Sequence, residues 1–230
     1  MTVLFITGTH TGIGKTLVTA ALAAQLAKAG RRVAAIKPVA TGFDAGNVGT
    51  TDTGILLAAL GREATAAAID AVSPFRFRAA LSPDMAAARE GRRIEPARLV
   101  DSCRRATEAN GVLLIEGIGG VMTPLGPGFT VLDWIAALGC PALLVAGSYL
   151  GTLSHTLTAC AAMRARGAAP AAVVVSESAE SPVPLAETCA TLAAFLDPVR
   201  VLALPRLAPG PLPWLRAPDL ATQLCAVLDA

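Results

Sequence analysis

The chain contains 230 residues, of which 53% are hydrophobic and 16% are charged, and its formal net charge is +2. A chain of this length can bury roughly 70–75% of its unfolded surface in one core, so we expect a single domain over residues 1–230. The near-neutral charge and the dispersed basic residues are not those of a nucleic-acid-binding surface. The most apolar stretch, residues 136–153, is interrupted by Pro141 and three glycines, so it lacks the ~18–20 apolar residues that a membrane-spanning helix needs.

The start of the sequence and the cysteines favour a cytoplasmic protein. The N-terminus enters the first apolar run without the basic start and cleavage site of a signal peptide. The cysteines are odd in number and lack paired, metal-type spacing. This pattern favours reduced thiols over a disulfide framework. The five residues are Cys103, Cys140, Cys160, Cys189 and Cys225.

Apolar, β-branched runs alternate with helical patterns along the whole chain. This alternation predicts an α/β fold with a mainly parallel sheet flanked by helices. Glycines at 30, 139 and 167 fall just after predicted helices, where a C-cap residue belongs. Strands are expected at 3–7, 33–37, 112–116, 142–146, 172–175 and 199–203. Helices are expected at 15–29, 52–60, 96–109, 132–138, 152–166, 185–195 and 219–228.

Residues 8–16, with the sequence GTHTGIGKT, connect the first predicted strand to the first predicted helix. A strand, a glycine-rich turn and a helix start are the context of a phosphate-binding P-loop. The usual motif has a glycine where this chain has Thr9, and Gly8 stands one residue earlier. An ordinary βα turn would explain the glycines alone, but the agreement of all three features favours a P-loop. The expected fold is therefore a three-layer, P-loop NTPase-like α/β fold.

The P-loop assignment gives each of its residues a role. A turn built on Gly12, Ile13 and Gly14 lets backbone N–H groups converge on phosphate oxygens without a clash. The positive end of the following helix points to the same place. Lys15 can then reach the β- and γ-phosphates, and the Thr16 hydroxyl suits a Mg²⁺ ligand. Leu17, the next residue, is included in the predicted nucleotide site.

Lys37 ends the second apolar strand and is followed by Pro-Val-Ala-Thr-Gly. Because the carboxyl ends of parallel strands meet at one edge of the sheet, we expect its ammonium group to lie beside the transferring phosphoryl group. Stabilisation of charge is most of what a phosphoryl-transfer site supplies. The alternative is a lysine whose stem lies along apolar surface while its head reaches solvent.

Two carboxylates are candidate Mg²⁺ ligands. Glu116 ends the third apolar strand, and Gly117, Ile118 and Gly119 follow it. Asp52 opens a predicted helix after a loop rich in glycine and threonine, where a simple N-cap is the alternative interpretation. Both roles can hold at once.

The remaining candidates are a proline-rich segment and two histidines. Residues 205–213 follow the last strand, and their prolines exclude regular helix and inner strand. They form either a surface loop or a wall of the nucleotide pocket. His10 and His155 have no cluster of partners that would indicate a metal, and His155 is expected to be partly buried.

The motifs GTHTGIGKT at 8–16, KPVATG at 37–42 and EGIGG at 116–120 resemble those of dethiobiotin synthetase in order and spacing. The resemblance extends over essentially the whole chain. The first two motifs together are fairly specific, whereas the P-loop alone would admit several related ATPases. Further matches are Ser82-Pro83 with Glu90-Gly91, Asp133-Trp134, Leu150-Gly151 with His155, and Leu204-Pro205-Arg206-Leu207.

The resemblance implies an ATP-dependent ligase that uses Mg²⁺ and closes the ureido ring of dethiobiotin from 7,8-diaminononanoate (7,8-diaminopelargonate) and CO₂. One substrate amine captures CO₂ as a carbamate, and a carbamate oxygen takes the γ-phosphoryl group. The second amine attacks the resulting carbamic-phosphoric anhydride and expels phosphate. This path needs cations near the carbamate and the γ-phosphate, and it needs no protein nucleophile.

The resemblance also implies a role for individual residues. Lys37 is the family's catalytic lysine and acts with Lys15, while Thr11 and Thr41 position the diamine or the carbamate. Thr16, Asp52 and Glu116 complete the Mg²⁺ site. The family is a homodimer in which the substrate tail contacts the partner subunit near the segment formed here by Leu150, Gly151, Thr152 and Ser154. The nucleotide site also includes Ser176, Pro205, Arg206 and Leu207.

This chain departs from the family pattern at four positions. Ser154 and Ser176 stand where asparagines are typical, the latter at the position that reads the nucleobase. Asp84 replaces the histidine of a Ser-Pro-His motif, and Thr188 replaces a tyrosine. Serine lacks the paired donor and acceptor of an amide. These changes are therefore expected to affect recognition of the nucleobase and of the substrate carboxylate, and to leave binding of the phosphates intact.

Two other functions are compatible with a P-loop. One is a related enzyme that activates another carboxylate or carbamate with ATP, or an amidating enzyme, for which the asparagine-to-serine changes are the main support. The other is a nucleotide-switch or partitioning ATPase. Against the switch, the chain shows no basic amphipathic tail and carries the Lys37 motif, which a switch does not require.

Overall fold

Six parallel strands form the central sheet, in the order β10-β9-β8-β1-β5-β2. The computed structural model describes residues 2–108 and 111–229. All six predicted strands are confirmed, and each observed end lies within one residue of the prediction. The strands are β1 Thr2–Gly8, β2 Val33–Ile36, β5 Val112–Glu116, β8 Ala142–Ala146, β9 Ala172–Ser176 and β10 Arg200–Leu204.

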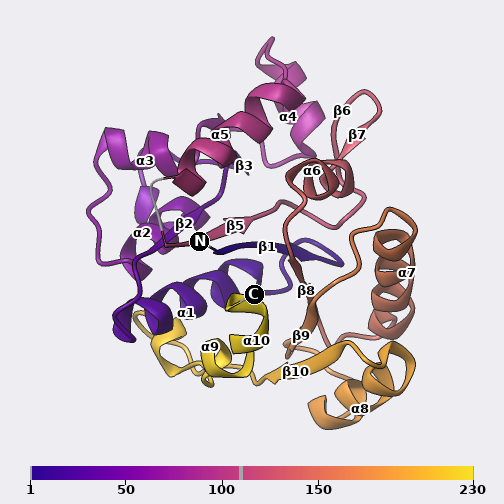
Figure 1. Ribbon diagram of the computed structural model, residues 1–230. Coiled ribbons are helices and arrows are strands. Elements are labelled where there is room, and N and C mark those ends of the chain that lie inside the picture. Colours follow the sequence, from indigo (N-terminus) through magenta and orange to yellow (C-terminus); the bar gives the residue numbers. More distant parts are fainter. Residues whose placement is uncertain (1, 109–110, 230) are drawn as a thin grey trace.

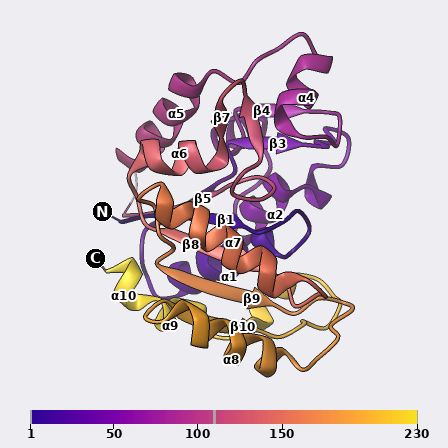
Figure 2. The ribbon, with the colours of Figure 1, turned by 90° about the vertical axis from the view of Figure 1, so that its right-hand side faces the viewer.

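Helices cover both faces of this sheet, which gives the three predicted layers (Figure 1). One face is covered by α1 Lys15–Lys28, α2 Asp52–Ala59, α3 Ala66–Val72, α9 Leu220–Gln223 and α10 Cys225–Leu228. The other face is covered by α4 Pro83–Arg89, α5 Pro96–Glu108, α6 Val131–Leu138, α7 Thr152–Ala165 and α8 Leu185–Leu196. Figure 2 shows α7 in front of the strands. Ala109, which the predicted helix 96–109 included, lies outside the described residues.

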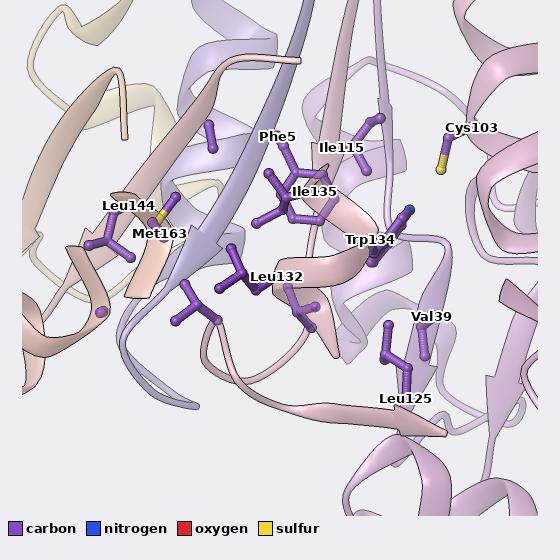
Figure 3. Close-up of a cluster of buried hydrophobic side chains, with 14 of the residues drawn as sticks. Phe5, Val39, Cys103, Ile115, Leu125, Leu132, Trp134, Ile135, Leu144 and Met163 are labelled. Atoms are coloured by element: carbon purple, nitrogen blue, oxygen red, sulfur yellow. The ribbon is translucent and has the colours of Figure 1, made fainter. Parts of the chain in front are cut away.

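Successive side chains in each strand enter different cores, because strand side chains alternate between the two faces of a sheet. In β1, Leu4 and Ile6 belong to the cluster that α1 covers, while Phe5 belongs to the opposite cluster. Phe5 meets the fully buried Trp134 of α6 edge to face, with ring centroids 4.8 Å apart (Figure 3). Burial on both faces explains why the strands are continuous apolar runs in the sequence.

Several elements were not predicted. The helices α3 and α4 are each seven residues long, too short to show a clear helical period. Two small sheets also form, one from β3 Val39–Thr41 and β4 Phe75–Phe77 and one from β6 Pro124–Gly126 and β7 Phe129–Thr130. Two 3₁₀ turns, η1 Val48–Thr50 and η2 Pro213–Arg216, complete the described elements.

The single helix predicted at 219–228 is wrong, because the chain breaks there into α9 and α10 at Leu224. Leu220, Leu224 and Leu228 are all buried against α1 and its neighbours. Positions four residues apart in a straight helix drift by about 40° around the axis. The break at Leu224 keeps all three leucines directed into the same core.

Gln25 of α1 holds the start of this C-terminal region. Its Oε1 accepts hydrogen bonds from the backbone N–H groups of Leu220 (2.9 Å) and Ala221 (3.0 Å). Its Nε2 donates to the carbonyl oxygen of Pro218 at 2.8 Å. One side chain therefore fixes the C-terminal region to the helix that follows the P-loop.

In the part of the chain that the structure describes, no helix combines the length and the apolar character needed to cross a membrane. The same part contains no disulfide.

A thiol reagent at pH 8 is expected to modify Cys225 rapidly and Cys140 slowly. Cys225 is exposed, whereas burial raises the pKa of the Cys140 thiol to about 11. Only about 1 in 1,000 Cys140 side chains is then a reactive thiolate at pH 8, and the rate should rise about tenfold per pH unit up to that pKa. Peptide mass spectrometry over time measures both rates. Equal rates at pH 8 would contradict the raised pKa of the partly buried Cys140 thiol.

Candidate functional site: a phosphate loop with two buried lysines

The loop between β1 and α1 has the backbone that a P-loop requires. Gly12 and Gly14 have φ angles of 77° and 94°, in the left-handed region that favours glycine. Gly14 is the N-cap of α1, which begins at Lys15 as predicted. A Cβ atom on Gly14 would lie 2.7 Å from the Ser176 hydroxyl oxygen at the end of β9. The loop therefore lies directly against that strand end, and no larger residue fits there.

Lys15 is buried and lies across the loop that it follows. Its Nζ donates a hydrogen bond to the carbonyl oxygen of His10 at 2.7 Å, and the residue is 6% exposed. Burial and then the neighbouring charge of Lys37 lower the pKa of Lys15 to about 8, against the opposing effect of Glu116 and Asp52. The ammonium group thus lies beside a second cation, an arrangement that suits an anionic ligand.

Four side chains from four different elements meet beside Lys15. Lys37 follows β2, Glu116 ends β5, Asp52 opens α2 and Thr16 is the second residue of α1. The Lys37 Nζ lies 2.6 Å from Glu116 Oε1, 2.9 Å from Asp52 Oδ2 and 3.3 Å from the Gly117 carbonyl oxygen. The Thr16 hydroxyl lies 2.8 Å from Glu116 Oε1 and 2.9 Å from Asp52 Oδ1.

The cluster keeps its charges although it is largely buried. Lys37 is 4% exposed and Glu116 is fully buried. Burial alone would lower the pKa of Lys37, but the carboxylates of Glu116 and Asp52 raise it above its ordinary value. Burial likewise opposes ionisation of Asp52, yet Lys37 and Thr16 hold its pKa below the ordinary value. The alternative of a solvent-directed lysine is therefore wrong for Lys37.

The oxygen atoms of this cluster fit a Mg²⁺ ion. Glu116 Oε2 is buried and has no hydrogen-bond partner among the described residues. Together with Asp52 and the Thr16 hydroxyl it offers hard oxygen ligands of the kind that hold Mg²⁺ next to phosphates. Asp52 is not the N-cap of α2, because Thr51 takes that position and accepts a hydrogen bond from the Gly54 N–H. The Asp52 side chain is thereby available to the cluster.

A cavity of about 520 Å³ lies beside the loop, on the side away from Lys37. Its walls include eight of the predicted nucleotide residues, namely Gly12, Ile13, Gly14, Leu17, Ser176, Pro205, Arg206 and Leu207. The proline-rich segment therefore lines a pocket. A hydrogen bond connects this segment to the residue after β9: the backbone N–H of Arg206 donates to Glu177 Oε2 at 2.8 Å. The proline-rich segment also contributes Ala208, Pro209, Gly210 and Pro213 to the lining. Sequence reasoning missed Glu177, Ser178 and Ala179, whose only signal is that they directly follow the end of β9.

The glycines after Glu116 support the loop from the other side and are not among the residues that line the cavity. The Gly117 N–H donates to the Ile6 carbonyl oxygen at 2.9 Å. Gly119 has a φ of 62°, and Ile118 is partly buried between these two glycines. A Cβ atom on Gly120 would lie 2.8 Å from the Thr9 carbonyl oxygen. Gly120 therefore approaches the P-loop backbone closely, whereas Gly117 is held against β1.

The predicted substrate residues fall into two groups. Thr11 is exposed in the P-loop, and Thr41 is partly exposed at the end of β3. The second group surrounds the start of α7, where Gly151 is the N-cap with a φ of 97°. Leu150 and Ser154 are exposed there. Within the described residues this second group forms no hydrogen bond or ion pair with the Lys37 cluster.

Thr152 is buried, and its hydroxyl donates to the Gly147 carbonyl oxygen at 2.7 Å. The hydroxyl therefore supports the start of α7.

His155, expected to be partly buried, is exposed. It lies in the first turn of α7 with its Nδ1 atom 2.8 Å from the Tyr149 hydroxyl. The same tyrosine ring lies 6.3 Å from the His10 ring of the P-loop.

Comparison with known proteins agrees with these features. The model of an AAA domain family matches residues 2–215. The ATP-dependent dethiobiotin synthetase BioD of Caulobacter sp. (strain K31) is 48% identical over 208 residues, which are 90% of this chain and 89% of that protein. The enzyme of the same name from Acidiphilium cryptum (strain JF-5) is 47% identical over 82% of this chain and 85% of that protein.

The chain belongs to the dethiobiotin synthetase family.

Solved structures confirm the fold of this family member at low sequence identity. The MinC:MinD cell division protein complex of Aquifex aeolicus matches with a TM-score of 0.55 and 12% identity over 89% of this chain and 81% of that chain. A ParA family ATPase from Chlorobium tepidum TLS matches with a TM-score of 0.53 and 13% identity over 99% of this chain and 90% of that chain. Both confirm the P-loop NTPase-like α/β fold.

The four departures from the dethiobiotin synthetase pattern lie in different surroundings. Ser176 ends β9 against the P-loop and lines the cavity, whereas Ser154 is exposed on α7. Thr188 is buried within α8. Asp84 accepts a hydrogen bond from the Ser82 hydroxyl at 2.5 Å. Only Ser176 is thus in direct contact with the proposed nucleotide pocket.

Proposed function

We propose that this protein is an ATP-dependent dethiobiotin synthetase, which carboxylates 7,8-diaminononanoate with CO₂ and closes the ureido ring with hydrolysis of ATP in biotin biosynthesis. The observation that carries the proposal is the buried Lys37 ammonium, placed beside the P-loop by two carboxylates. The similarity to dethiobiotin synthetases over about 90% of the chain supports the same activity.

In the proposed reaction the protein acts by holding and neutralising charge. The nucleotide phosphates would occupy the P-loop, with Lys15 directed to the β- and γ-phosphates and the base in the 520 Å³ cavity. Thr16, Asp52 and Glu116 would hold Mg²⁺, which when bound neutralises phosphate charge. Glu116 would contribute the Oε2 atom that has no hydrogen-bond partner.

Lys37 would stabilise the carbamate and the transferring phosphoryl group. Its ammonium group has three donors and contacts three acceptors, on Glu116, Asp52 and Gly117. Contact with a substrate oxygen therefore requires that one of these acceptors be released. Asp52 is the proposed one, because its side chain is 44% exposed while that of Glu116 is fully buried. Thr11 and Thr41 would position the diamine by hydroxyl hydrogen bonds.

We also propose a homodimer in which the segment Leu150–Ser154 contacts the substrate tail of the partner subunit. Leu150 is 86% exposed and Leu153 is 37% exposed, and an exposed apolar segment of this kind suits an interface. The backbone N–H groups at the start of α7 would receive the substrate carboxylate. We further propose a cytoplasmic location, where the reduced thiols are stable.

One assay tests the proposed activity. Purified protein is incubated with MgATP, bicarbonate and 7,8-diaminononanoate, and dethiobiotin is followed by mass spectrometry. The expected result is dethiobiotin in an amount equal to the ADP released. ATP turnover that does not depend on the diamine would favour a nucleotide switch, and turnover only with another acid would favour a related carboxylate-activating enzyme.

The protein is expected to discriminate only weakly between nucleobases, so that the turnover rates with ATP and CTP lie within a few-fold of each other. Ser176 lines the cavity with one hydroxyl group, which cannot provide the paired donor and acceptor of an amide. Initial rates of dethiobiotin formation with each nucleotide measure the preference. Ser176→Asn serves as the matched variant and should raise selectivity for ATP. A strict ATP preference in the unmodified protein would contradict this role of Ser176.

A further inference from the structure

Two serines form a reciprocal pair of hydrogen bonds just beyond the ends of β8 and β9. The Ser148 N–H donates to the Ser178 hydroxyl oxygen at 3.0 Å, and the Ser178 N–H donates to the Ser148 hydroxyl oxygen at 2.9 Å. Each side chain thus satisfies the backbone of the other, which continues the pairing of the two strands after their ladder ends at Ala146 and Val175. We call this pair the serine clamp.

The serine clamp is partly buried and tightly fitted. Ser148 is 1% exposed, and its carbonyl oxygen lies 3.1 Å from the Ser181 hydroxyl. A Cβ atom on the preceding Gly147 would lie 2.9 Å from the Ser178 hydroxyl oxygen and 2.7 Å from the Tyr149 ring. Buried backbone groups that lose their partners are costly, so the clamp determines where the loop after β9 lies.

The loop that the clamp fixes lines two cavities. On one side, Ser176–Ala179 line the 520 Å³ cavity beside the P-loop. On the other side, Glu180–Pro182 and the pair Tyr149 and Leu150 line a second cavity of about 440 Å³. A change in the position of this loop therefore alters both cavities at once.

The chain continues from Ser148, the other residue of the clamp, to the start of α7. Gly147, next to Ser148, accepts the Thr152 hydroxyl hydrogen bond, and the Thr152 N–H donates to the Tyr149 carbonyl oxygen at 3.1 Å. Through these contacts Ser148 lies between the wall of the proposed nucleotide pocket and the helix start that is proposed to receive the carboxylate of the substrate bound by the partner subunit.

We propose that Ser148 and Ser178 are positioning residues that couple nucleotide binding to binding of the diamino acid. This inference rests on the proposed function. Neither residue acts on the reacting atoms. Nucleotide in the 520 Å³ cavity, or a carboxylate of the partner subunit's substrate at the start of α7, favours the clamped position of the shared loop, and in that position the other ligand binds more tightly. Such coupling is a free energy shared by the two sites, so each ligand strengthens the other by the same factor.

The test measures the affinity of a non-hydrolysable ATP analogue with and without saturating 7,8-diaminononanoate, by calorimetry on the full chain. In the unmodified protein the diamino acid is expected to tighten the analogue at least about five-fold, the lower end of typical coupling. Ser178→Ala removes one hydroxyl from the clamp and should reduce this factor to about one. Its KM values for ATP and for the diamino acid should both rise, while kcat changes less than either.

Three further variants separate positioning from general stability. Ser178→Thr retains a hydroxyl and should restore the coupling. Gly147→Ala retains both serine hydroxyls but intrudes on the clamp, so it should weaken the coupling. Ser102→Ala, which removes a hydroxyl bonded locally to the Leu99 carbonyl oxygen in α5, should leave the coupling unchanged.

The outcomes are distinct from those that test the proposed function. If the unmodified protein forms dethiobiotin but shows no coupling, or if Ser178→Ala keeps the full coupling factor, the inference is overturned and the proposed function stands. A protein that forms no dethiobiotin overturns both. Loss of coupling in Ser178→Ala with recovery in Ser178→Thr supports the clamp as the coupling element.

Discussion

Replacing Lys37 with alanine is expected to reduce the rate of dethiobiotin formation by roughly 10²–10³-fold, the usual effect of removing one donor that stabilises developing charge. Nucleotide affinity should change little, because Lys15 and the P-loop backbone remain. Single-turnover formation of dethiobiotin at saturating ATP, together with the affinity for an ATP analogue, measures the two effects separately. An unchanged rate would remove Lys37 from the mechanism.

The control for this experiment concerns stability. Removing Lys37 leaves the fully buried Glu116 carboxylate without its closest cation, and breaking a buried pair costs roughly 3–5 kcal/mol of unfolding free energy. Lys37→Gln retains a hydrogen-bond donor for Glu116 and is the matched variant. It should unfold closer to the temperature of the unmodified protein while remaining as inactive as Lys37→Ala.

Replacing Glu116 with glutamine is expected to raise the Mg²⁺ concentration needed for half-maximal activity by at least 10–100-fold, about the loss seen when even a group outside the ligand shell is removed. Glu116 carries the oxygen atom with no hydrogen-bond partner and also contacts Lys37 and Thr16. The neutral amide weakens all of these interactions. Rates of dethiobiotin formation over a range of Mg²⁺ concentrations measure the shift.

Asp52→Asn is the matched control for Glu116→Gln. Both changes convert a carboxylate to an amide, but the Asp52 side chain is 44% exposed and that of Glu116 is fully buried. Water can replace part of the lost interaction at Asp52, so its effect should be smaller. Equal shifts in the two variants would contradict the assignment of Glu116 as the main carboxylate ligand.

The central sheet and the charged cluster could be predicted because they depend on strong local signals. Strands buried on both faces must be continuous apolar runs, and parallel strands must end at the same edge of the sheet. Lys37 and Glu116, which are 79 positions apart in the sequence, lie 2.6 Å from each other for that reason. The shared sheet edge thus predicts the approach of Lys37 and Glu116, while Lys15 follows from the P-loop motif and Asp52 from its position after a loop rich in glycine and threonine.

Other features depend on tertiary contacts that leave no signal in the sequence. The helices α3 and α4 are too short to show a period. The break at Leu224 follows from the core that three leucines share with α1. The serine clamp involves two ordinary loop residues 30 positions apart, and only the arrangement of β8 beside β9 brings them together.

Gln25 has a consequence for how the nucleotide cavity can open. The proline-rich wall at 205–213 leaves the sheet at Leu204 and is tied to α1 again at Pro218, and α1 also begins at the P-loop. The P-loop and the proline-rich segment, which form two walls of the cavity, are thus both attached to α1. Entry and release of the nucleotide are therefore expected to involve movement of the segment between these two anchor points, or of the loop after β9, rather than a swing of the whole C-terminal region.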